Sequence, residues 1–288
     1  MRLSDAVLQQ CHYQHASALN LDPNRDFGFS MLKADVRLDD LRKWLDRQQQ
    51  LLWANHGPAV LIWLQGPDCS GKDGAIRNSL RGLNPQGVRV SDFQKPTEQE
   101  RNEHFLTRYR KQLPTPGMIT VFNRTPYEGL VSDLADGDID SRQAAERLQQ
   151  LLAFEAQLAE QNIHLIKIYL HISKAEQKKR LQQRFINPEK RWKISAADLT
   201  GHQNFEQIQE NWNQAFAQSS SLTHPWHILP AHNKALRNLL ICSLIAQKLE
   251  ALDLKWPQPA LPFAIEDLDL ACSSPGQSLS THTQQAAR

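Results

Sequence analysis

A short apolar segment followed directly by a glycine-bearing loop is the feature that most constrains the fold of this chain. Residues 58–65 (PAVLIWLQ) are apolar on both faces, as is typical of a strand buried in the middle of a parallel sheet. The loop 66–74 (GPDCSGKDG) follows, and a predicted helix continues through about residue 80. Strand, loop and helix in this order predict an α/β fold with a parallel sheet.

The same alternation of apolar runs and helical patterns continues along most of the chain. Four further strands are predicted over residues 88–93, 118–122, 165–170 and 227–229. Helices are predicted between them, over residues 38–55, 97–111, 142–161, 174–186, 196–218 and 232–252. From residue 253 to 288 the sequence is rich in Pro, Ser, Gln and Thr and has few apolar residues, so we expect a disordered tail.

Composition and charge exclude several classes of protein. The net charge of +2 gives no general attraction to nucleic acid or to a membrane surface, so any anion must bind at a local cluster of cations. The first residues lack the apolar stretch of a signal peptide, and no segment approaches the roughly 18 apolar residues of a membrane helix. The four cysteines are far apart, which disfavours a disulfide framework or a zinc site. These features predict a cytoplasmic protein.

The loop after the first strand matches the pattern G-x-x-x-x-G-K through Gly66, Gly71 and Lys72. Glycines let the chain fold around an anion so that backbone N–H groups point inward, and the next helix contributes its positive end. Lys72 then places a cation against the outer phosphates. The predicted phosphate-binding residues of this loop are Gly66, Ser70, Gly71, Lys72, Asp73 and Gly74.

One position departs from the usual phosphate loop. The Ser or Thr that normally follows the lysine and binds Mg²⁺ is replaced by Asp73. Asp68, inside the loop, is the candidate that holds the metal instead, because Mg²⁺ prefers hard oxygen ligands. The alternative is that Asp68 only stabilises the turn through its own backbone.

A second group of candidate residues follows the strand predicted at 118–122. Asn123, Arg124 and Glu128 come after its carboxyl end, where functional groups of parallel sheets collect. Arg124 is placed to stabilise charge on a phosphoryl group in transfer, and the alternative is a surface ion pair. Asn123 is suited to holding a metal-bound water, while Glu128 is a second candidate for the metal.

Cations are concentrated in residues 174–193, where only two acidic residues accompany them. Beside a phosphate loop, such a segment predicts a lid that closes over several phosphates. A solvated helix face is the alternative, and RNA binding is weakly supported by a single short patch. The lid candidates are Arg180, Arg184, Lys190, Arg191 and Lys193.

Several blocks of the chain resemble the polyphosphate kinase type 2 family. Besides the loop GPDCSGKDG, they are NPQGVRV (84–90), KPTEQERNEHFLTRYRKQLPTPGMITVFNRTPYEGLV (95–131), LHISKAEQKKRLQQRFINPEKRWKISAADL (170–199) and PAHNKALRNLLICSLIAQKL (230–249). The resemblance covers residues 31–252, which leaves an N-terminal extension (1–30) and the tail (253–288) outside it.

This resemblance implies a three-layer α/β/α P-loop kinase core with a helical lid at about 174–199. It also implies Mg²⁺-dependent transfer (or Mn²⁺ in its place) between inorganic polyphosphate and a nucleoside mono- or diphosphate, by a homo-oligomer. Asp68 and Lys72 match the family's catalytic residues, and Arg124 a phosphate contact. Arg108 and Lys111 match further basic residues near the substrates. The FNR sequence at 122–124 is similar to the branch that acts on both mono- and diphosphates.

Two other functions remain compatible with the residues. An ATP-dependent kinase of a nucleotide or another small molecule would share the phosphate loop and lid, but would not need so many lid cations. A degenerate phosphate-binding regulator would explain Asn123, although Asp68, Lys72 and Arg124 are all retained.

Overall fold

The structure is a computed structural model that describes residues 2–13, 21–29 and 31–270. The chain divides into two units, Met1–Lys255 and Trp256–Arg288. In the second unit, only residues 256–270 are described, and they include one short helix, α12 (Asp267–Leu270). The rest of the predicted tail, residues 271–288, lies outside the described residues.

Five parallel strands form one sheet with the order β2-β3-β1-β4-β5. Their bounds are β1 (Ala59–Gln65), β2 (Val88–Asp92), β3 (Ile119–Asn123), β4 (Ile163–His171) and β5 (Trp226–Pro230). Every residue of β1 is buried, because β1 lies in the middle of the sheet between β3 and β4. The predicted α/β fold with a parallel sheet is confirmed.

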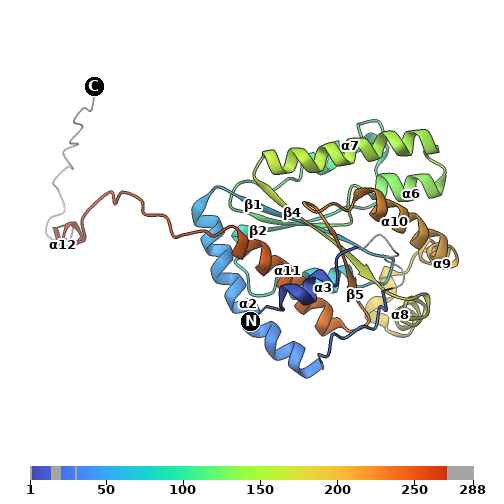
Figure 1. Cartoon of the computed structure of the whole chain (residues 1–288), viewed down its shortest axis with the longest axis horizontal. Coiled ribbons are helices and arrows are strands. Elements are labelled where there is room, and N and C mark those ends of the chain that lie inside the picture. Colours follow the sequence, from blue (N-terminus) through green and yellow to red (C-terminus); the bar gives the residue numbers. More distant parts are fainter. Residues whose placement is uncertain (1, 14–20, 30, 271–288) are drawn as a thin grey trace. The chain divides into compact units, whose positions relative to one another are not determined.

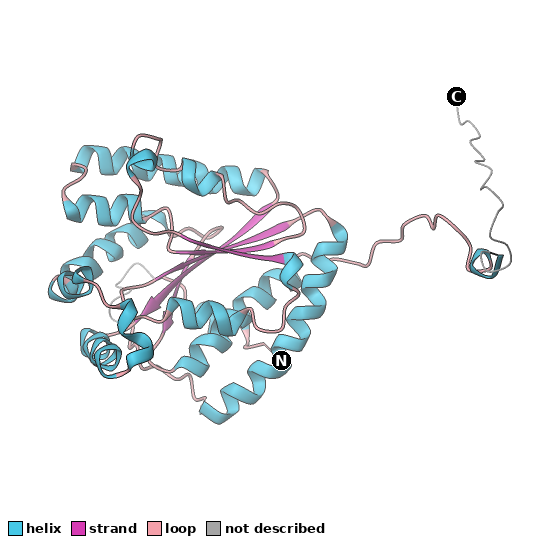
Figure 2. Cartoon of the chain, turned by 180° about the vertical axis from the view of Figure 1, so that it is seen from behind, coloured by secondary structure: helices cyan, strands magenta, loops and turns pink. Residues whose placement is uncertain are grey.

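Helices cover both faces of the sheet and complete a three-layer core (Figures 1 and 2). One face is covered by α6 (Glu128–Asp136), α7 (Ser141–Glu160) and α10 (Phe205–Ser219). The other is covered by α2 (Met31–Asn55), α3 (Lys72–Ser79) and α11 (Lys234–Ala251), with α1 (Asp5–Gln9) beside α11. None of the described helices has the length and hydropathy needed to cross a membrane.

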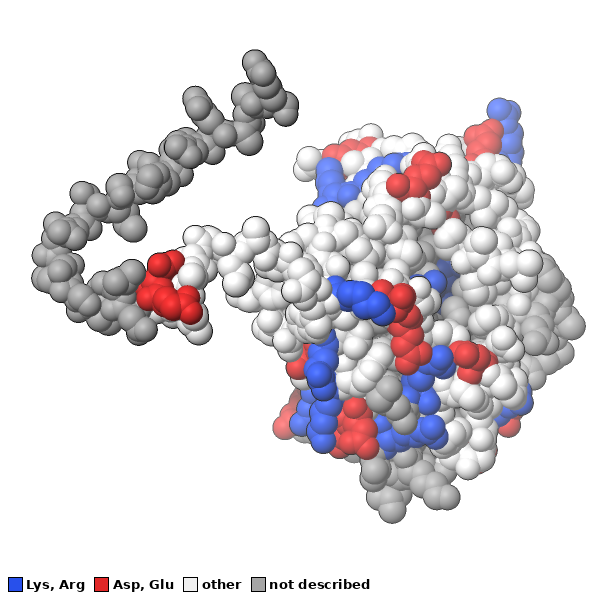
Figure 3. All heavy atoms as spheres, turned by 60° about the vertical axis from the view of Figure 1, so that its left-hand side comes forward, with Lys and Arg blue, Asp and Glu red and all other residues white. Residues whose placement is uncertain are grey.

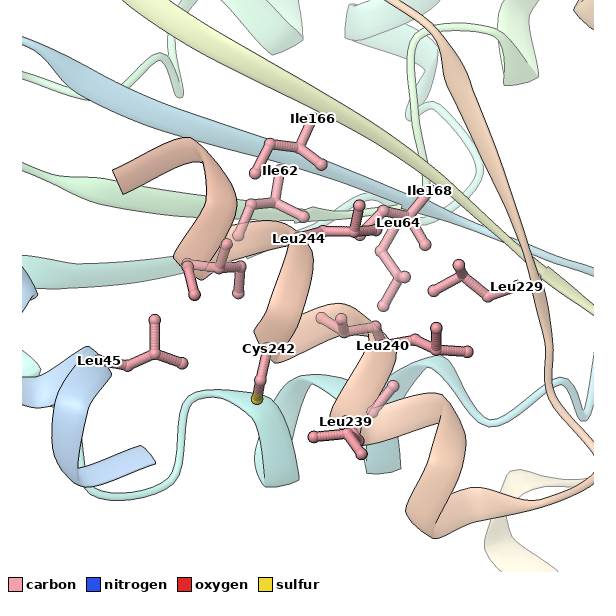
Figure 4. Close-up of a cluster of buried hydrophobic side chains, with 14 of the residues drawn as sticks. Leu45, Ile62, Leu64, Ile166, Ile168, Leu229, Leu239, Leu240, Cys242 and Leu244 are labelled. Atoms are coloured by element: carbon pink, nitrogen blue, oxygen red, sulfur yellow. The ribbon is translucent and has the colours of Figure 1, made fainter. Parts of the chain in front are cut away.

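The second face is held by α11, which is buried along nearly its whole length. Figure 4 shows Leu240 and Leu244 of α11 beside Ile62 of β1 and Ile168 of β4. Burying one such side chain contributes about 1.5–3 kcal/mol. The same helix therefore anchors the sheet and, at its first turn, lies beside the loop that follows β1.

The predicted helices were wrong in two places. Residues 97–111 form two short helices, α4 (Glu98–Arg101) and α5 (Thr107–Arg110), since the ring of His104 accepts a hydrogen bond from the Leu106 N–H between them. Residues 196–218 divide at Asn204 into α9 (Ala196–Gln203) and α10. Helix α6 was not predicted. Helix α2 was predicted from residue 38 but begins at Met31. The other predicted helices and all five predicted strands begin and end within a few residues of the observed bounds.

The N-terminal residues cover the outer edge of β5. The Tyr13 N–H donates to the Trp226 carbonyl (2.8 Å), and the Ile228 N–H donates to the Cys11 carbonyl (2.6 Å). The rings of His12 and His227 meet edge to face with centroids 4.8 Å apart. An exposed sheet edge is a template for pairing with other chains, so this segment protects the sheet.

Two buried histidines predict that stability falls in mild acid. Burial lowers the pKa of His227 to about 3 and that of His171 to about 4, so the unfolded chain binds more protons than the folded one below pH 6.5. Between pH 7.5 and 5.5 each residue should therefore remove about 1.4 kcal/mol from the free energy of unfolding. Denaturant unfolding across this range measures the slope. His227→Asn should reduce it, and an unchanged slope would contradict the assignment.

Candidate active site at the phosphate loop

The phosphate loop connects the carboxyl end of β1 to α3, and its glycines are needed for its shape. Gly66 has φ +156°, and a Cβ there would lie 2.8 Å from the Leu170 carbonyl oxygen and 2.7 Å from Ser70 Oγ. Gly71 has φ +94°, a left-handed conformation, and a Cβ there would lie 2.6 Å from Arg237 Nη1. The loop is therefore closely packed from behind by β4 and α11.

Lys72 is directed back over this loop. Its Nζ donates to the carbonyl oxygens of Gly66 (2.7 Å) and Pro67 (3.3 Å). Burial lowers the pKa of Lys72, and the nearby Asp68 carboxylate works in the opposite direction. Because neutral carbonyls are weaker partners for an ammonium than phosphate oxygens are, the same side chain is suited to binding a phosphate at the loop.

Arg124, directly after β3, contacts both the end of β1 and the phosphate loop. Its backbone is left-handed (φ +73°), which is unusual for a residue with a side chain, and its N–H donates to the Leu64 carbonyl of β1 (2.9 Å). Its guanidinium lies 4.0 Å from Asp68 Oδ1 and 3.9 Å from Glu128 Oε1. Strained backbone of this kind clusters at functional sites, where it fixes the direction of a side chain.

The two acidic candidates have different surroundings. Both oxygens of Glu128 accept hydrogen bonds, one from Gln65 Nε2 (2.7 Å) and one from Ser132 Oγ (2.5 Å). The Asp68 carboxylate is 40% exposed and accepts no hydrogen bond from the described residues. Asp68 is therefore the carboxylate that is open to a cation, whereas Glu128 is held in place beside Arg124.

Asp73 and Asn123 interact with each other and with the lid. The Asn123 amide donates to Asp73 Oδ1 (3.2 Å), and Lys193 Nζ donates to Asp73 Oδ2 (2.6 Å). Burial alone would raise the pKa of Asp73, but the hydrogen bond and charge of Lys193 bring it below its ordinary value. Asp73 thus joins the end of β3 to the lid.

The lid consists of α8 (Lys174–Ile186), the 3₁₀ helix η3 (Pro188–Lys193) and α9 (Ala196–Gln203), and α8 and α9 lie at the same end of the molecule in Figure 1. Gln177 Nε2 donates to the Asp68 backbone carbonyl oxygen (3.2 Å), and the side-chain oxygen Oε1 of Gln177 is 2.7 Å from His202 Nδ1. A Cβ on Gly201 would lie 3.4 Å from Asp68 Oδ2. The lid therefore lies against the phosphate loop at Asp68.

The five predicted lid cations fall into different environments. Arg180 donates to the carbonyls of the phosphate loop, at Ser70 (2.9 Å) and Cys69 (3.1 Å), so it anchors the lid to the loop. Arg184 pairs with Asp198 (3.1 Å). The side chains of Lys190 and Arg191 are exposed, and Lys193 contacts Asp73 as described above.

Arg108 lies on α5, and Lys111 directly follows the end of this helix. Arg108 donates to the Gln94 carbonyl (2.9 Å), and the Gln94 side-chain oxygen is 3.5 Å from Arg124 Nη1. Lys111 pairs with Glu103 (2.9 Å). Arg108 is thus connected to the site through Gln94, whereas Lys111 is held by Glu103.

Sequence reasoning did not identify Arg237, which packs against Gly71, or the Gln177–His202 contact at Asp68. A single arginine within the apolar pattern of residues 232–252 was the one available signal for Arg237. On the face seen in Figure 3, Lys and Arg lie interspersed with Asp and Glu.

The parallel sheet, the glycine loop at the end of its central strand and the adjacent lid define a P-loop kinase fold. The chain belongs to the Polyphosphate kinase 2 (PPK2) family, whose sequence profile matches residues 31–257. It is 38% identical to the AMP/ADP-polyphosphate phosphotransferase of Meiothermus ruber over 76% of this chain and 82% of that protein. It is 36% identical to the ADP-polyphosphate phosphotransferase of Rhodopseudomonas palustris over 79% of this chain and 81% of that protein.

Solved structures agree with the sequence comparison. The crystal structure of Polyphosphate Kinase 2 from Arthrobacter aurescens TC1 has a TM-score of 0.87 with this chain at 30% sequence identity. The match covers 92% of this chain and 96% of that one. The resemblance to this family and the predicted fold are both confirmed.

Proposed function

We propose that this protein transfers a phosphoryl group between inorganic polyphosphate and a nucleoside mono- or diphosphate. The observation that carries the proposal is the gathering of Asp68, Lys72 and Arg124 at a phosphate loop that a lid with exposed cations adjoins. The relatives from Meiothermus ruber and Rhodopseudomonas palustris, named for AMP/ADP and ADP as substrates, support it.

The side chains divide the chemistry among them. The loop N–H groups and Lys72 bind the phosphates, and Arg124 neutralises charge that develops on the phosphoryl group in transfer. Glu128, held by Gln65 and Ser132, fixes Arg124 in this position. The lid excludes water and aligns the donor and acceptor phosphates in line.

Asp68 is the residue that would hold Mg²⁺, or Mn²⁺ in its place, together with substrate phosphates. Among the described residues, no three carboxylate, histidine or cysteine side chains gather into a metal site. An exposed single carboxylate fits a Mg²⁺ that keeps most of its coordination to water and phosphate. Bound there, the ion supplies positive charge to the phosphate oxygens.

Asn123 is compatible with an active enzyme. Its amide donates to Asp73, so a carboxylate at position 123 would face another carboxylate at this distance. We propose that Asn123 preserves the contact between β3 and Asp73, and that the protein accepts both AMP and ADP. A homo-oligomeric state and a cytoplasmic location remain predictions.

The function is tested with purified protein, long-chain polyphosphate, Mg²⁺ and either ADP or AMP. Nucleotide products are separated by chromatography, and ATP is also measured with luciferase. ATP from ADP, and ADP or ATP from AMP, should form only when polyphosphate is present. Product formation with ATP as donor and no polyphosphate requirement would favour a conventional kinase. Folded protein that binds polyphosphate without any transfer would favour a regulator.

The exposed lid cations should determine affinity for the long substrate. Replacing Lys190 and Arg191 together by alanine should raise the KM for long-chain polyphosphate about tenfold, because two cations that face solvent no longer meet the polyanion. The KM for ADP should change less than about twofold. The matched control is Arg142→Ala on α7, whose side chain is 87% exposed. Equal increases in both KM values would contradict a lid that binds polyphosphate.

A further inference from the structure

Arg237 is a buried cation directly behind the phosphate loop. It lies in the first turn of α11 and is only 2% exposed. Its Nη1 is 3.5 Å from the Ser70 carbonyl oxygen and 2.6 Å from the position of a Cβ on Gly71. Its Nε and Nη2 donate to the side-chain oxygen of Asn238 (3.2 and 2.8 Å). The guanidinium therefore contacts the loop at the turn that leads into Lys72.

No carboxylate of the described residues forms an ion pair with Arg237. Its charged neighbour is another cation, Arg180, which donates to the same Ser70 carbonyl (2.9 Å). Burial, and then Arg180, lower the pKa of Arg237 to about 10, so the group is still charged at neutral pH. A buried charge without a counter-charge is costly, and proteins normally avoid it.

We propose that Arg237 is a positioning residue for the phosphate loop, and that the bound phosphates supply its counter-charge. This rests on the proposed function, because it assigns the missing negative charge to the substrate. Arg237 and Arg180 hold the Ser70 carbonyl on the side of the loop away from the phosphates. The positive charge behind the loop then interacts with the phosphates in front of it, through a layer of backbone that excludes water.

A purely structural role makes a different prediction. If Arg237 only packed α11 against the loop, its loss would lower stability without changing how strongly a phosphate anion stabilises the fold. If it acts on the phosphates, its loss removes binding energy that appears only with the anion present. Measuring the stability without anion and the added stability with anion therefore distinguishes a structural role from a role in phosphate binding.

The experiment measures thermal unfolding of the full chain at increasing tripolyphosphate with MgCl₂ and no nucleotide. In Arg237→Met, which keeps a side chain of similar length without charge, the concentration for half of the Tm shift should rise at least about tenfold. Arg237→Lys keeps the charge and should remain within about threefold of the wild type. Leu240→Ala, one turn further along α11, should lower the starting Tm but leave the half-shift concentration unchanged within about twofold.

Several outcomes overturn the proposal in distinguishable ways. A wild-type response in Arg237→Met, with Lys72→Ala abolishing the shift, would leave the phosphate loop intact and refute the role of Arg237. A wild-type protein that tripolyphosphate does not stabilise would refute the phosphate loop itself, and the role of Arg237 with it. If Arg237→Met does not fold, two other variants test the role of the charge. A wild-type Tm shift by tripolyphosphate in Arg237→Ala would refute it. So would an Arg237→Lys protein that loses the Tm shift as completely as Lys72→Ala does.

Discussion

Replacing Lys72 by alanine should lower kcat for phosphoryl transfer by about a thousandfold. The Nζ donates to Gly66 and Pro67 within its own loop, so the substitution removes the cation without breaking a contact between distant elements. Burial also disfavours the charged form of Lys72, as its lowered pKa indicates, so removing it should not unfold the protein. Single-turnover transfer from polyphosphate to ADP, with Tm measured on the same sample, tests both statements.

Lys43→Ala is the matched control for Lys72. This lysine is 81% exposed on α2, and its ion pair with Asp40 is long (3.8 Å). The kcat of the Lys43→Ala variant should equal that of the wild type. A folded Lys72→Ala protein with wild-type kcat would exclude the proposed site, whereas loss of activity in both variants would indicate an effect of preparation rather than of the phosphate loop.

The loss of Arg124 should be equally severe, and its backbone allows an unusually clear test. Because Arg124 adopts a left-handed conformation, glycine at this position relieves strain while it removes the guanidinium. Arg124→Gly should therefore keep or raise the Tm while kcat falls about a thousandfold. Arg124→Lys should recover part of the rate, since it restores the charge but not the planar group.

Arg142→Ala provides the exposed arginine control, because Arg142 pairs only with its helix neighbour Glu146 among the described residues. Its kcat and Tm should match those of the wild type. An Arg124→Gly protein that retains activity would show that the guanidinium does not act on the phosphoryl group. A parallel fall in Tm and kcat would instead assign Arg124 to folding.

The sheet and the phosphate loop were predictable because local patterns determine them. An apolar strand followed by Gly66, Gly71 and Lys72 indicates both the strand and the loop within one short segment. The division of residues 97–111 was not predictable in this way, because it depends on a hydrogen bond to the His104 ring rather than on periodicity. Local propensity is a weak guide where one side-chain contact decides the backbone.

The contacts of the candidate site were less accessible from sequence. The cations of residues 174–193 were visible, but their pattern did not distinguish Arg180, which holds loop carbonyls, from the exposed Lys190 and Arg191. The position of Arg237 behind Gly71 depends on how α11 packs across the sheet. Such long-range packing leaves no periodic signal, and only the unusual residue type within an apolar helix hints at it.

The pairing of residues 11–13 with β5 also constrains the order in which the molecule is built. Residues 11–13 leave the ribosome long before residues 226–228, so they find their partner strand only after the chain between them has been synthesised. Until then Leu3, Leu8 and Cys11, which are all buried in the folded protein, lack the core residues that they pack against. Contacts between such distant positions slow folding. Closure of the sheet edge is thus expected as a late step of biosynthesis.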